Sequence, residues 1–383
     1  MKEEEQISFN WPYMTGKELF FIAEAHFNGC LAGDGPFTER CHAWFKKRTG
    51  ADRVFLTHSC TAALEMAALV AGLRPGDEVI MPSYTFVSTA NAFVLRGAVP
   101  VFADIREDTL NLDENLLESA ITPRTKAIVP VHYAGVGCEM DTIMAVAARY
   151  RLRVIEDAAQ GVMATYKGRA LGSIGHLGAY SFHETKNVIS GEGGAILVNE
   201  QGLVELAEIV WEKGTDRSRY FRGEVDKYTW QDVGSSYLPG ELMAAFLWAQ
   251  LEEADQITSE RLRLWQQYHD GLAPLEAAGY LRRPIIPPEC AHNAHMYYVL
   301  LAPGIDRQTV LETLKLQGIG AVFHYVPLHS SPAGMRFGRV AGMLPVTETV
   351  AEQLIRLPLW IGLSDEQQFR VVQTLSDALI PDC

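Results

Sequence analysis

Short apolar runs alternate with helix-like stretches through the first half of the chain, and this alternation limits the possible fold more than any other feature. The strand-like runs fall at 54–56, 79–81, 99–103, 127–131 and 153–155. The helix-like stretches fall between them, at 61–71, 88–96, 114–120 and 141–149. Strands and helices that alternate in this way predict a mainly parallel sheet with helices on both faces. The expected fold class is therefore α/β.

The last third of the chain predicts a smaller α+β domain. A helical region begins near Leu242 and carries an amphipathic stripe of Leu262, Trp265, Tyr268, Leu272 and Leu275. The prolines within 284–288 end that region, because proline breaks a helix. Beyond them the pattern predicts strands at 296–301 and 320–325 and helices at 307–317 and 365–379. We expect a large domain over 1–255, with an N-terminal segment, and a smaller domain over 256–383.

Composition excludes several classes of protein. The 383 residues suffice for two domains, and a hydrophobic content of 48% suits a well-buried core. The net charge of −14 argues against general nucleic-acid binding, which needs a basic surface. No apolar stretch reaches about 18 residues, so we expect no membrane span. Residues 1–6 are charged and do not form a secretory signal. The six cysteines lack regular spacing, which is typical of reduced thiols in the cytoplasm.

One carboxylate and one lysine follow predicted strands within the stretch 153–199. Asp157 comes directly after Val154-Ile155-Glu156, and Lys186 follows Tyr180-Ser181-Phe182. Open α/β sheets bind their ligands at loops that leave the strands, so both side chains are expected at one site. Pyridoxal phosphate requires this pair, because its aldehyde forms a Schiff base with a lysine and its ring nitrogen needs a carboxylate partner.

Several motifs in this stretch carry a family resemblance. They read E-D-A-A-Q at 156–160, S-F-H-E-T-K-N at 181–187 and G-E-G-G at 191–194. In this order they resemble the sugar aminotransferases of the DegT/DnrJ/EryC1/StrS family, and the resemblance runs from about residue 30 to about residue 379. It implies a fold-type I pyridoxal phosphate enzyme, similar to aspartate aminotransferase, that acts as a homodimer with shared active sites.

The resemblance assigns roles to residues around the cofactor ring. Lys186 would form the Schiff base and then act as the general base that moves a proton. Asp157 would hold the protonated ring nitrogen, and Gln160 would bond the phenolic oxygen. A lone lysine is otherwise a solvated charge, and an aspartate after a strand otherwise caps a turn. The motifs favour the catalytic interpretation for both.

Further residues are expected to hold the cofactor phosphate and to cover the ring. Ser59, Cys60 and Thr61 open a helix after the first strand, which is a favourable place for a phosphate. Ser181 would add a hydroxyl, and Phe86 would stack on the ring. The simpler interpretations are a plain helix cap for the first group and a core side chain for Phe86.

The chain departs from the family at one position of the expected subunit interface. Related sequences read G-x-N-Y-R-M-x-E, in which the asparagine reaches the phosphate of the neighbouring subunit. Here Ser236 stands in place of that asparagine, and a serine hydroxyl has a shorter reach. We still expect Ser236 to contribute to cofactor binding, although its shorter side chain puts the contact with the neighbour in question.

Six residues are candidates for substrate binding. The aromatic and histidine candidates come from motif positions, and the arginines lie in the basic run 213–227, which can supply cations for a sugar diphosphate. The candidates are Tyr84, His183, Arg219, Arg222, Tyr325 and His329. Interleaved acids make a solvated loop the simpler interpretation of the basic run. The histidine pairs lack a matching ligand cluster, so no metal site is expected.

The resemblance also implies a reaction. Segments such as F-R-G-E-V-D-K-Y-T-W, together with the serine departure, resemble the branch that makes dideoxygalactose amines. The expected reaction transfers an amino group from L-glutamate to C4 of TDP-4-keto-6-deoxy-D-glucose, for surface-polysaccharide synthesis. The alternatives are a glucose-configured 4-amine, a 3-amine, or a non-catalytic regulator on the same fold. A nicotinamide dehydrogenase is disfavoured, because no G-x-G-x-x-G follows the first strand.

Overall fold

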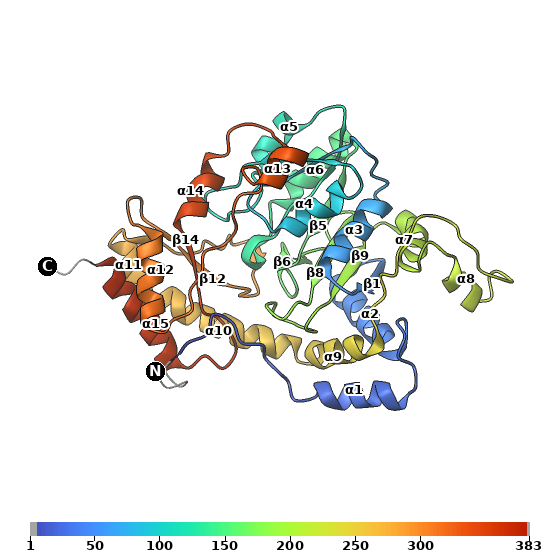
Figure 1. Cartoon of the computed structure of the whole chain (residues 1–383), viewed down its shortest axis with the longest axis horizontal. Coiled ribbons are helices and arrows are strands. Elements are labelled where there is room, and N and C mark those ends of the chain that lie inside the picture. The colour runs from blue at the N-terminus through green and yellow to red at the C-terminus, as the bar shows by residue number, and fades with distance from the viewer. Residues whose placement is uncertain (1–5, 381–383) are drawn as a thin grey trace.

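The computed structural model describes residues 6–380, and a mainly parallel eight-stranded sheet forms its centre (Figure 1). Across the sheet the strands are β1 (Arg53–Thr57), β9 (Gly194–Val198), β8 (Leu177–Ser181), β5 (Arg153–Asp157), β4 (Thr125–Ile128), β2 (Glu78–Pro82), β3 (Val99–Ala103) and β13 (Arg339–Val340). Of these described strands, β9 alone runs against its neighbours. The carboxyl ends of the other strands therefore meet at one edge, where ligands of such sheets bind.

Alternating strand residues enter two separate hydrophobic clusters, one on each face of the sheet. Val54 and Leu56 of β1 lie in one cluster, whereas Phe55 between them lies in the other. The helices of this part are α2 (Pro36–Thr49), α3 (Cys60–Val70), α4 (Val87–Val94), the short η2 (Glu114–Leu116) with α5 (Leu117–Ala120), η3 (Tyr133–Gly135), α6 (Met140–Tyr150), η4 (Gln201–Leu203) and α7 (Val204–Trp211). The predicted α/β class is confirmed, because a sheet buried on both faces needs both helical layers.

The N-terminal helix α1 (Glu18–Phe27) packs against α9 (Glu241–Glu252) along one side of the molecule (Figure 1). Phe21 and Ala25 form its buried side. Three large apolar side chains of this helix point outward: Leu19, Phe20 and Phe27 are 80%, 67% and 84% exposed. Among residues 6–380, no segment covers these three side chains.

The C-terminal part builds a smaller α+β layer around helix α10 (Ala254–Gly271). Its antiparallel sheet has the order β10 (Leu281–Arg282), β12 (Tyr297–Leu301), β14 (Leu354–Leu357). Its helices are α11 (Ala273–Ala277), α12 (Arg307–Leu316), α13 (Pro332–Phe337), α14 (Pro345–Gln353) and α15 (Asp365–Leu379). The stripe predicted on α10 lies in the core of this layer. Short β13 returns to the large sheet beside β3, and the division at 255/256 stays a prediction.

The strand predicted at 320–325 is wrong. Only a single bridge joins Val322 to Arg356, and Tyr325 has a left-handed backbone with φ of 49°. A left-handed residue turns the chain out of a pleated strand, so this segment crosses toward the large domain as a loop. A third small sheet joins β6 (Thr165–Tyr166), β7 (Arg169–Ala170) and β11 (Cys290–Ala291). Among residues 6–380, no helix is both long enough and apolar enough to cross a bilayer.

Candidate active site

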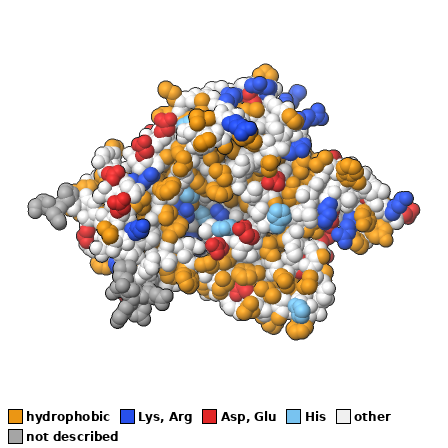
Figure 2. All heavy atoms as spheres, in the orientation of Figure 1, with side chains coloured by type: hydrophobic (Ala, Val, Ile, Leu, Met, Phe, Trp, Pro, Cys, Tyr) orange, Lys and Arg blue, Asp and Glu red, His pale blue; other side chains and the backbone are white. Residues whose placement is uncertain are grey.

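A cavity of about 560 Å³ opens at the carboxyl edge of the large sheet and brings together most of the predicted site residues. The predicted residues that line it are Ser59, Cys60, Thr61, Phe86, Asp157, Gln160, Ser181, His183, Lys186 and Tyr325. They come from loops far apart in the sequence. Figure 2 shows the depression near the middle of one face, with acidic, basic and histidine side chains gathered at it.

Lys186 lies on the loop that joins β8 to β9, at the wall of this cavity. Its backbone N–H donates to the His183 carbonyl at 2.8 Å, and the next residue, Asn187, anchors the loop by donating to the Asn293 carbonyl at 2.7 Å. Burial lowers the pKa of Lys186, and the Arg356 guanidinium lowers it further, whereas Cys60 and Asp157 oppose the shift. A lowered pKa increases the fraction of neutral amine, which is the nucleophilic form.

Asp157 ends β5 and is held in place by hydrogen bonds to both carboxylate oxygens. Thr89 donates its hydroxyl to Oδ2 at 2.6 Å, and the Ala159 N–H donates to Oδ1 at 3.1 Å. Thr85 shares a second hydroxyl hydrogen bond with Thr89 at 2.8 Å. Asp157 is 5% exposed and lines the cavity, and its two hydrogen bonds fix the position of the carboxylate.

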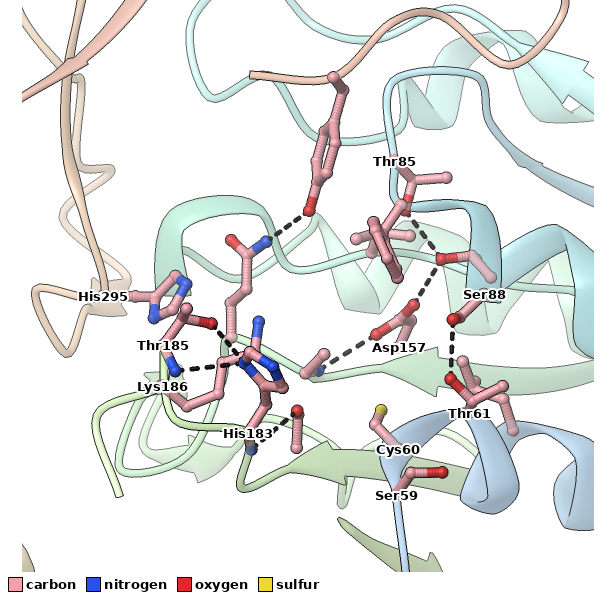
Figure 3. Close-up of a pocket in the computed structure, with 18 of the residues that line it drawn as sticks. Ser59, Cys60, Thr61, Thr85, Ser88, Asp157, His183, Thr185, Lys186 and His295 are labelled. Carbon is pink, nitrogen blue, oxygen red and sulfur yellow. Dashed lines mark hydrogen bonds between the residues drawn. The ribbon is translucent and has the colours of Figure 1, made fainter. Parts of the chain in front are cut away.

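The N-termini of α3 and α4 meet on the side of the cavity opposite Lys186 (Figure 3). Ser59 caps α3, where its hydroxyl accepts from the Ala62 N–H at 3.1 Å, and Thr61 shares a 2.7 Å hydrogen bond with Ser88 of α4. Gly194 lets strand β9 approach the start of α3, because a Cβ there would lie 2.5 Å from the Cys60 nitrogen. Converging helix N-termini and hydroxyls form a favourable site for a phosphate.

Gln160 and two aromatic residues form the remaining wall. The side-chain Oε1 of Gln160 accepts from the Ala134 N–H at 2.6 Å, which directs Nε2 to the Tyr325 hydroxyl at 3.0 Å. Phe86 caps the start of α4 and is 57% exposed, with its ring 6.5 Å from that of Tyr325. A flat aromatic ligand therefore has a planar surface and an amide donor beside it.

Comparison with known proteins decides the family. The profile of the DegT/DnrJ/EryC1/StrS aminotransferase family matches residues 14–376. The chain belongs to this family. It is 34% identical to the spore coat polysaccharide biosynthesis protein SpsC of Bacillus subtilis (strain 168) over 387 residues, with 98% of each chain covered. It is also 34% identical to the GDP-perosamine synthase of Caulobacter vibrioides, covering 99% of this chain and 100% of that protein.

A solved structure of DesI in the presence of its TDP-sugar product has the same fold. Its TM-score is 0.87 at 28% identity, with 97% of this chain and 92% of that chain covered. The chain is thus a pyridoxal phosphate-dependent aminotransferase with the fold-type I architecture that the sequence predicts. The cavity fits this cofactor, because an amine, a fixed carboxylate and a phosphate cradle line the same space. When bound there, the cofactor supplies the electron sink for amino transfer.

Five predicted site residues of this aminotransferase do not line the cavity. Tyr84 lies behind the wall, where its hydroxyl donates to the His324 carbonyl at 2.5 Å. His329 shares a 2.7 Å hydrogen bond with Ser83, outside the lining. Ser236 is exposed and forms a bridge with Glu212.

The other two residues, Arg219 and Arg222, lie on and just after α8 (Arg217–Phe221), which projects from the large domain (Figure 1). Both guanidinium groups form ion pairs with glutamates of their own chain, at distances from 2.7 to 3.2 Å. Within one chain they do not reach the cavity. Their contribution to substrate binding stays a prediction, as do the roles of Tyr84, His329 and Ser236.

Sequence reasoning missed a group of lining residues, most of them hydroxyls or cations. They are Thr85, Ser88, Thr89, Thr185, His295, His324 and Arg356. The last three come from the C-terminal part of the chain. His324 directly precedes Tyr325 of a quoted motif, whereas no motif marked His295 or Arg356. For Arg356 a signal exists, because it is the lone charge in the apolar run L-I-R-L of β14. A charge within a buried strand requires a partner or a function.

Proposed function

We propose that this aminotransferase transfers the amino group of L-glutamate to C4 of TDP-4-keto-6-deoxy-D-glucose, giving TDP-4-amino-4,6-dideoxy-D-galactose. The observation that carries the proposal is that Lys186 and Asp157 line one cavity together with the phosphate cradle. The names of two relatives, a GDP-perosamine synthase and a protein solved with its TDP-sugar product, support a keto nucleotide-sugar as the acceptor. We expect this product to be used in surface-polysaccharide synthesis, as the name of the spore coat relative suggests.

The proposed roles follow from the positions of the side chains. Lys186 holds the cofactor and moves the proton at the reacting carbon, helped by its lowered pKa. Asp157 would pair with the ring nitrogen from its fixed position. Gln160 donates one amide hydrogen to Tyr325 and would donate the other to the ring's phenolic oxygen. Phe86 supplies the stacking surface. The start of α3, with Ser59, Cys60 and Thr61, and the hydroxyl of Ser181 would bind the phosphate.

The substrate side of the cavity is bounded by His183 and Tyr325. His183 keeps its ring near Thr185, with Nδ1 at 2.9 Å from that hydroxyl, and its Nε2 lies 3.7 Å from Glu192. These polar groups lie at the cavity wall beside Lys186, where the hydroxyls of a sugar ring would need partners. Tyr84 and His329 would act from behind this wall, by holding the loops that carry the lining residues.

We also propose that the enzyme is a homodimer with active sites shared between subunits. The apolar face of α1 is open, and the projecting segment around α8 exposes Phe221 and Trp230 by 67% and 80%. Apolar side chains gathered at the surface mark sites of protein contact. In a dimer, the projecting segment of one subunit would bring Arg219, Arg222 and Ser236 toward the cavity of the other.

Product identification tests the proposed reaction. The protein, loaded with pyridoxal phosphate, is incubated with glutamate and the TDP-keto-sugar, and the product is analysed by NMR. An axial amine at C4 leaves H4 equatorial, so we expect a small coupling between H3 and H4. A large diaxial coupling would assign the glucose-configured amine instead, and an amine at C3 would assign the 3-amino alternative. A parallel incubation with the GDP-linked 4-keto sugar tests the nucleotide.

A further inference from the structure

His295 lines the cavity from the turn that leads into β12. The residue before it, Ala294, has a left-handed backbone with φ of 51°, a conformation that is rare outside glycine. Arg261 holds this turn, because its guanidinium donates to the carbonyls of Ala294 and His295 at 3.1 and 2.8 Å. A strained turn that is held in this way indicates that the position of the His295 ring serves a function.

A buried amide fixes which nitrogen of His295 carries the proton. Asn187 donates a side-chain N–H to the Asn293 carbonyl at 2.7 Å. Because a carbonyl can only accept, the atom of Asn187 at this contact is the amide nitrogen, and its Oδ1 is on the other side. That oxygen lies 3.0 Å from Nδ1 of His295. An amide oxygen can only accept as well, so Nδ1 of His295 carries the proton.

The second nitrogen of the His295 ring is an unused acceptor. Burial lowers the pKa of His295 well below its usual value, and the charged groups around it, Lys186 first, lower it further. A neutral ring with its single proton on Nδ1 presents a lone pair at Nε2. Within residues 6–380 no donor contacts Nε2, and this nitrogen is not sealed off from the cavity.

The amine of Lys186 is the donor that this acceptor fits. Its Nζ forms no hydrogen bond or ion pair within residues 6–380. Lys186 affects the His295 ring more strongly than Arg261 does, although Arg261 contacts the backbone of His295 directly. Coulomb interactions weaken with distance, so the amine lies close to the ring. Figure 3 shows the His295 ring beside the loop that carries Thr185 and Lys186.

Two other acceptors of the cavity wall are already engaged. The Thr185 hydroxyl shares a 2.9 Å hydrogen bond with Nδ1 of His183. Both carboxylate oxygens of Asp157 accept hydrogen bonds from their own chain. A neutral amine has two N–H groups and one lone pair, so an acceptor for one N–H decides where the lone pair points.

We propose that Nε2 of His295 accepts a hydrogen bond from the Lys186 amine whenever that amine is free of the cofactor, and thereby turns the lone pair of the amine toward the reacting carbon. The inference rests on the proposed role of Lys186 as the base that moves the proton. His295 is a positioning residue, because it takes up no proton itself. Asn187 keeps Nε2 unprotonated by holding the proton of the ring on Nδ1.

NMR of protein with isotopically labelled histidine observes both ring nitrogens directly. In the native protein we expect Nδ1 to be protonated and Nε2 to be unprotonated, with the signals identified by their loss in His295→Leu. Pyridoxamine phosphate leaves Lys186 free, so the Nε2 signal should be displaced toward the hydrogen-bonded position relative to protein loaded with pyridoxal phosphate. Lys186→Ala loaded with pyridoxamine phosphate should lack this displacement. Asn187→Ala should allow the proton to move to Nε2.

Single-turnover absorbance measures the proton step, with glutamate that is or is not deuterated at the reacting carbon. His295→Leu keeps the bulk of the side chain but has no acceptor. We expect it to react roughly five- to tenfold more slowly, the effect of one hydrogen bond, with a larger deuterium isotope effect and a nearly unchanged affinity for glutamate. His295→Gln keeps an acceptor and a donor and should recover most of the rate.

His292→Gln is the matched control for the structure of the turn. Nδ1 of His292 accepts from the Ala294 N–H at 3.2 Å, so this residue belongs to the same turn. Its ring packs against Trp265, with centroids 4.5 Å apart, and does not line the cavity. His292→Gln should therefore leave the rate and the isotope effect at their native values. Each variant is checked for native cofactor content and thermal stability.

The possible outcomes separate this inference from the proposed function. A proton on Nε2 of the native protein, or an equal Nε2 signal in the native protein and Lys186→Ala when both hold pyridoxamine phosphate, would overturn the inference and leave transamination intact. A defect of His295→Leu confined to glutamate affinity would overturn it too, as would an equal loss of rate in His292→Gln. Failure of borohydride to attach the cofactor to Lys186 would instead contradict the proposed function, and the NMR comparison would still decide whether the two side chains are bonded.

Discussion

The hydroxyl of Thr89 donates to Oδ2 of Asp157 at 2.6 Å, so a residue at the start of α4 fixes the carboxylate at the end of β5. Helix α4 follows β2 in the chain, and β4 lies between β2 and β5 in the sheet, so the hydrogen bond links separate parts of the cavity wall. Because a second hydroxyl, that of Thr85, supports Thr89, the carboxylate is placed before any ligand arrives. Such prior placement is what a partner for a charged ring nitrogen requires.

Two substitutions test the carboxylate and the hydroxyl that fixes it. Asp157→Asn should cause a severe loss of turnover with a much smaller loss of cofactor affinity, because the phosphate cradle is unaffected. Thr89→Val should reduce turnover roughly tenfold, since one hydrogen bond to a charged group is lost. Steady-state kinetics and cofactor titration measure both. Near-normal turnover of Asp157→Asn would mean that another group pairs with the ring nitrogen.

The hydrogen bond between Gln160 and Tyr325 supports a second prediction. Tyr325→Phe removes the partner of the Gln160 amide but keeps the ring near Phe86. We expect the free energy of cofactor binding to weaken by about 1 kcal/mol, the usual contribution of a neutral hydrogen bond. The visible absorption band of the bound cofactor should also shift. Gln160→Leu should shift the band further, because it also leaves the Ala134 N–H unpaired. An unchanged band in both variants would remove Gln160 from the ring contacts.

The sequence predicts the large domain better than the small one, for a physical reason. Buried parallel strands are continuous apolar runs between polar turns, so β1, β2, β3 and β5 fall within a residue or two of their predicted positions. The segment 320–325 also contains strand-like residues, but a left-handed Tyr325 and contacts with the large domain decide its path. The strand preference of individual residues does not reflect contacts with distant parts of the chain.

The same distinction applies to the site. The motifs place Asp157 and Lys186 in the cavity because Asp157 ends β5 and Lys186 lies on the loop that leaves β8. His295, His324 and Arg356 arrive from loops and a strand more than a hundred residues later, and tertiary packing alone brings them there. Ser236, Arg219 and Arg222 were predicted for a site shared between subunits, which a single chain does not build.

Mixing of inactive variants tests the shared site. A subunit with Lys186→Ala is combined with one that carries Arg219→Ala and Arg222→Ala, after dissociation and reassociation. In mixed dimers one of the two sites regains a complete set of residues, so we expect about a quarter of the native activity from random pairing. The control places all three substitutions in one chain and mixes it with Lys186→Ala, which should give none. Activity no greater than that of the separate variants would contradict the shared site.

Stability should fall on acidification, with His42 as one cause. Burial lowers the pKa of His42 to about 3, and its Nε2 accepts from the Leu56 N–H at 2.9 Å. An unfolded histidine binds its proton near pH 6.5, so below about that value the unfolded chain holds a proton that the native chain lacks. This contribution to the free energy of unfolding is present above pH 6.5 and is lost by about 1.4 kcal/mol per pH unit below it.

His42→Gln retains an acceptor for the Leu56 N–H but does not titrate. Between pH 6.5 and pH 4.5 we expect the free energy of unfolding of the variant to fall less steeply than that of the native protein. The difference in slope should correspond to one proton fewer taken up on unfolding. Urea unfolding at several pH values measures the slope, and His26→Gln, at an exposed site on α1, is the control. Equal slopes in the native protein and His42→Gln would show that His42 takes up a proton in the folded state.

The central claim is that Lys186 is the residue that holds pyridoxal phosphate, and chemical trapping tests it most directly. The loaded protein should absorb in the visible range, and borohydride should reduce the C=N bond between the cofactor and the lysine. Digestion and mass spectrometry should then find the cofactor on the peptide that contains Lys186, with no label in Lys186→Ala. A label on another lysine, or an equal label in Lys186→Ala, would contradict the account.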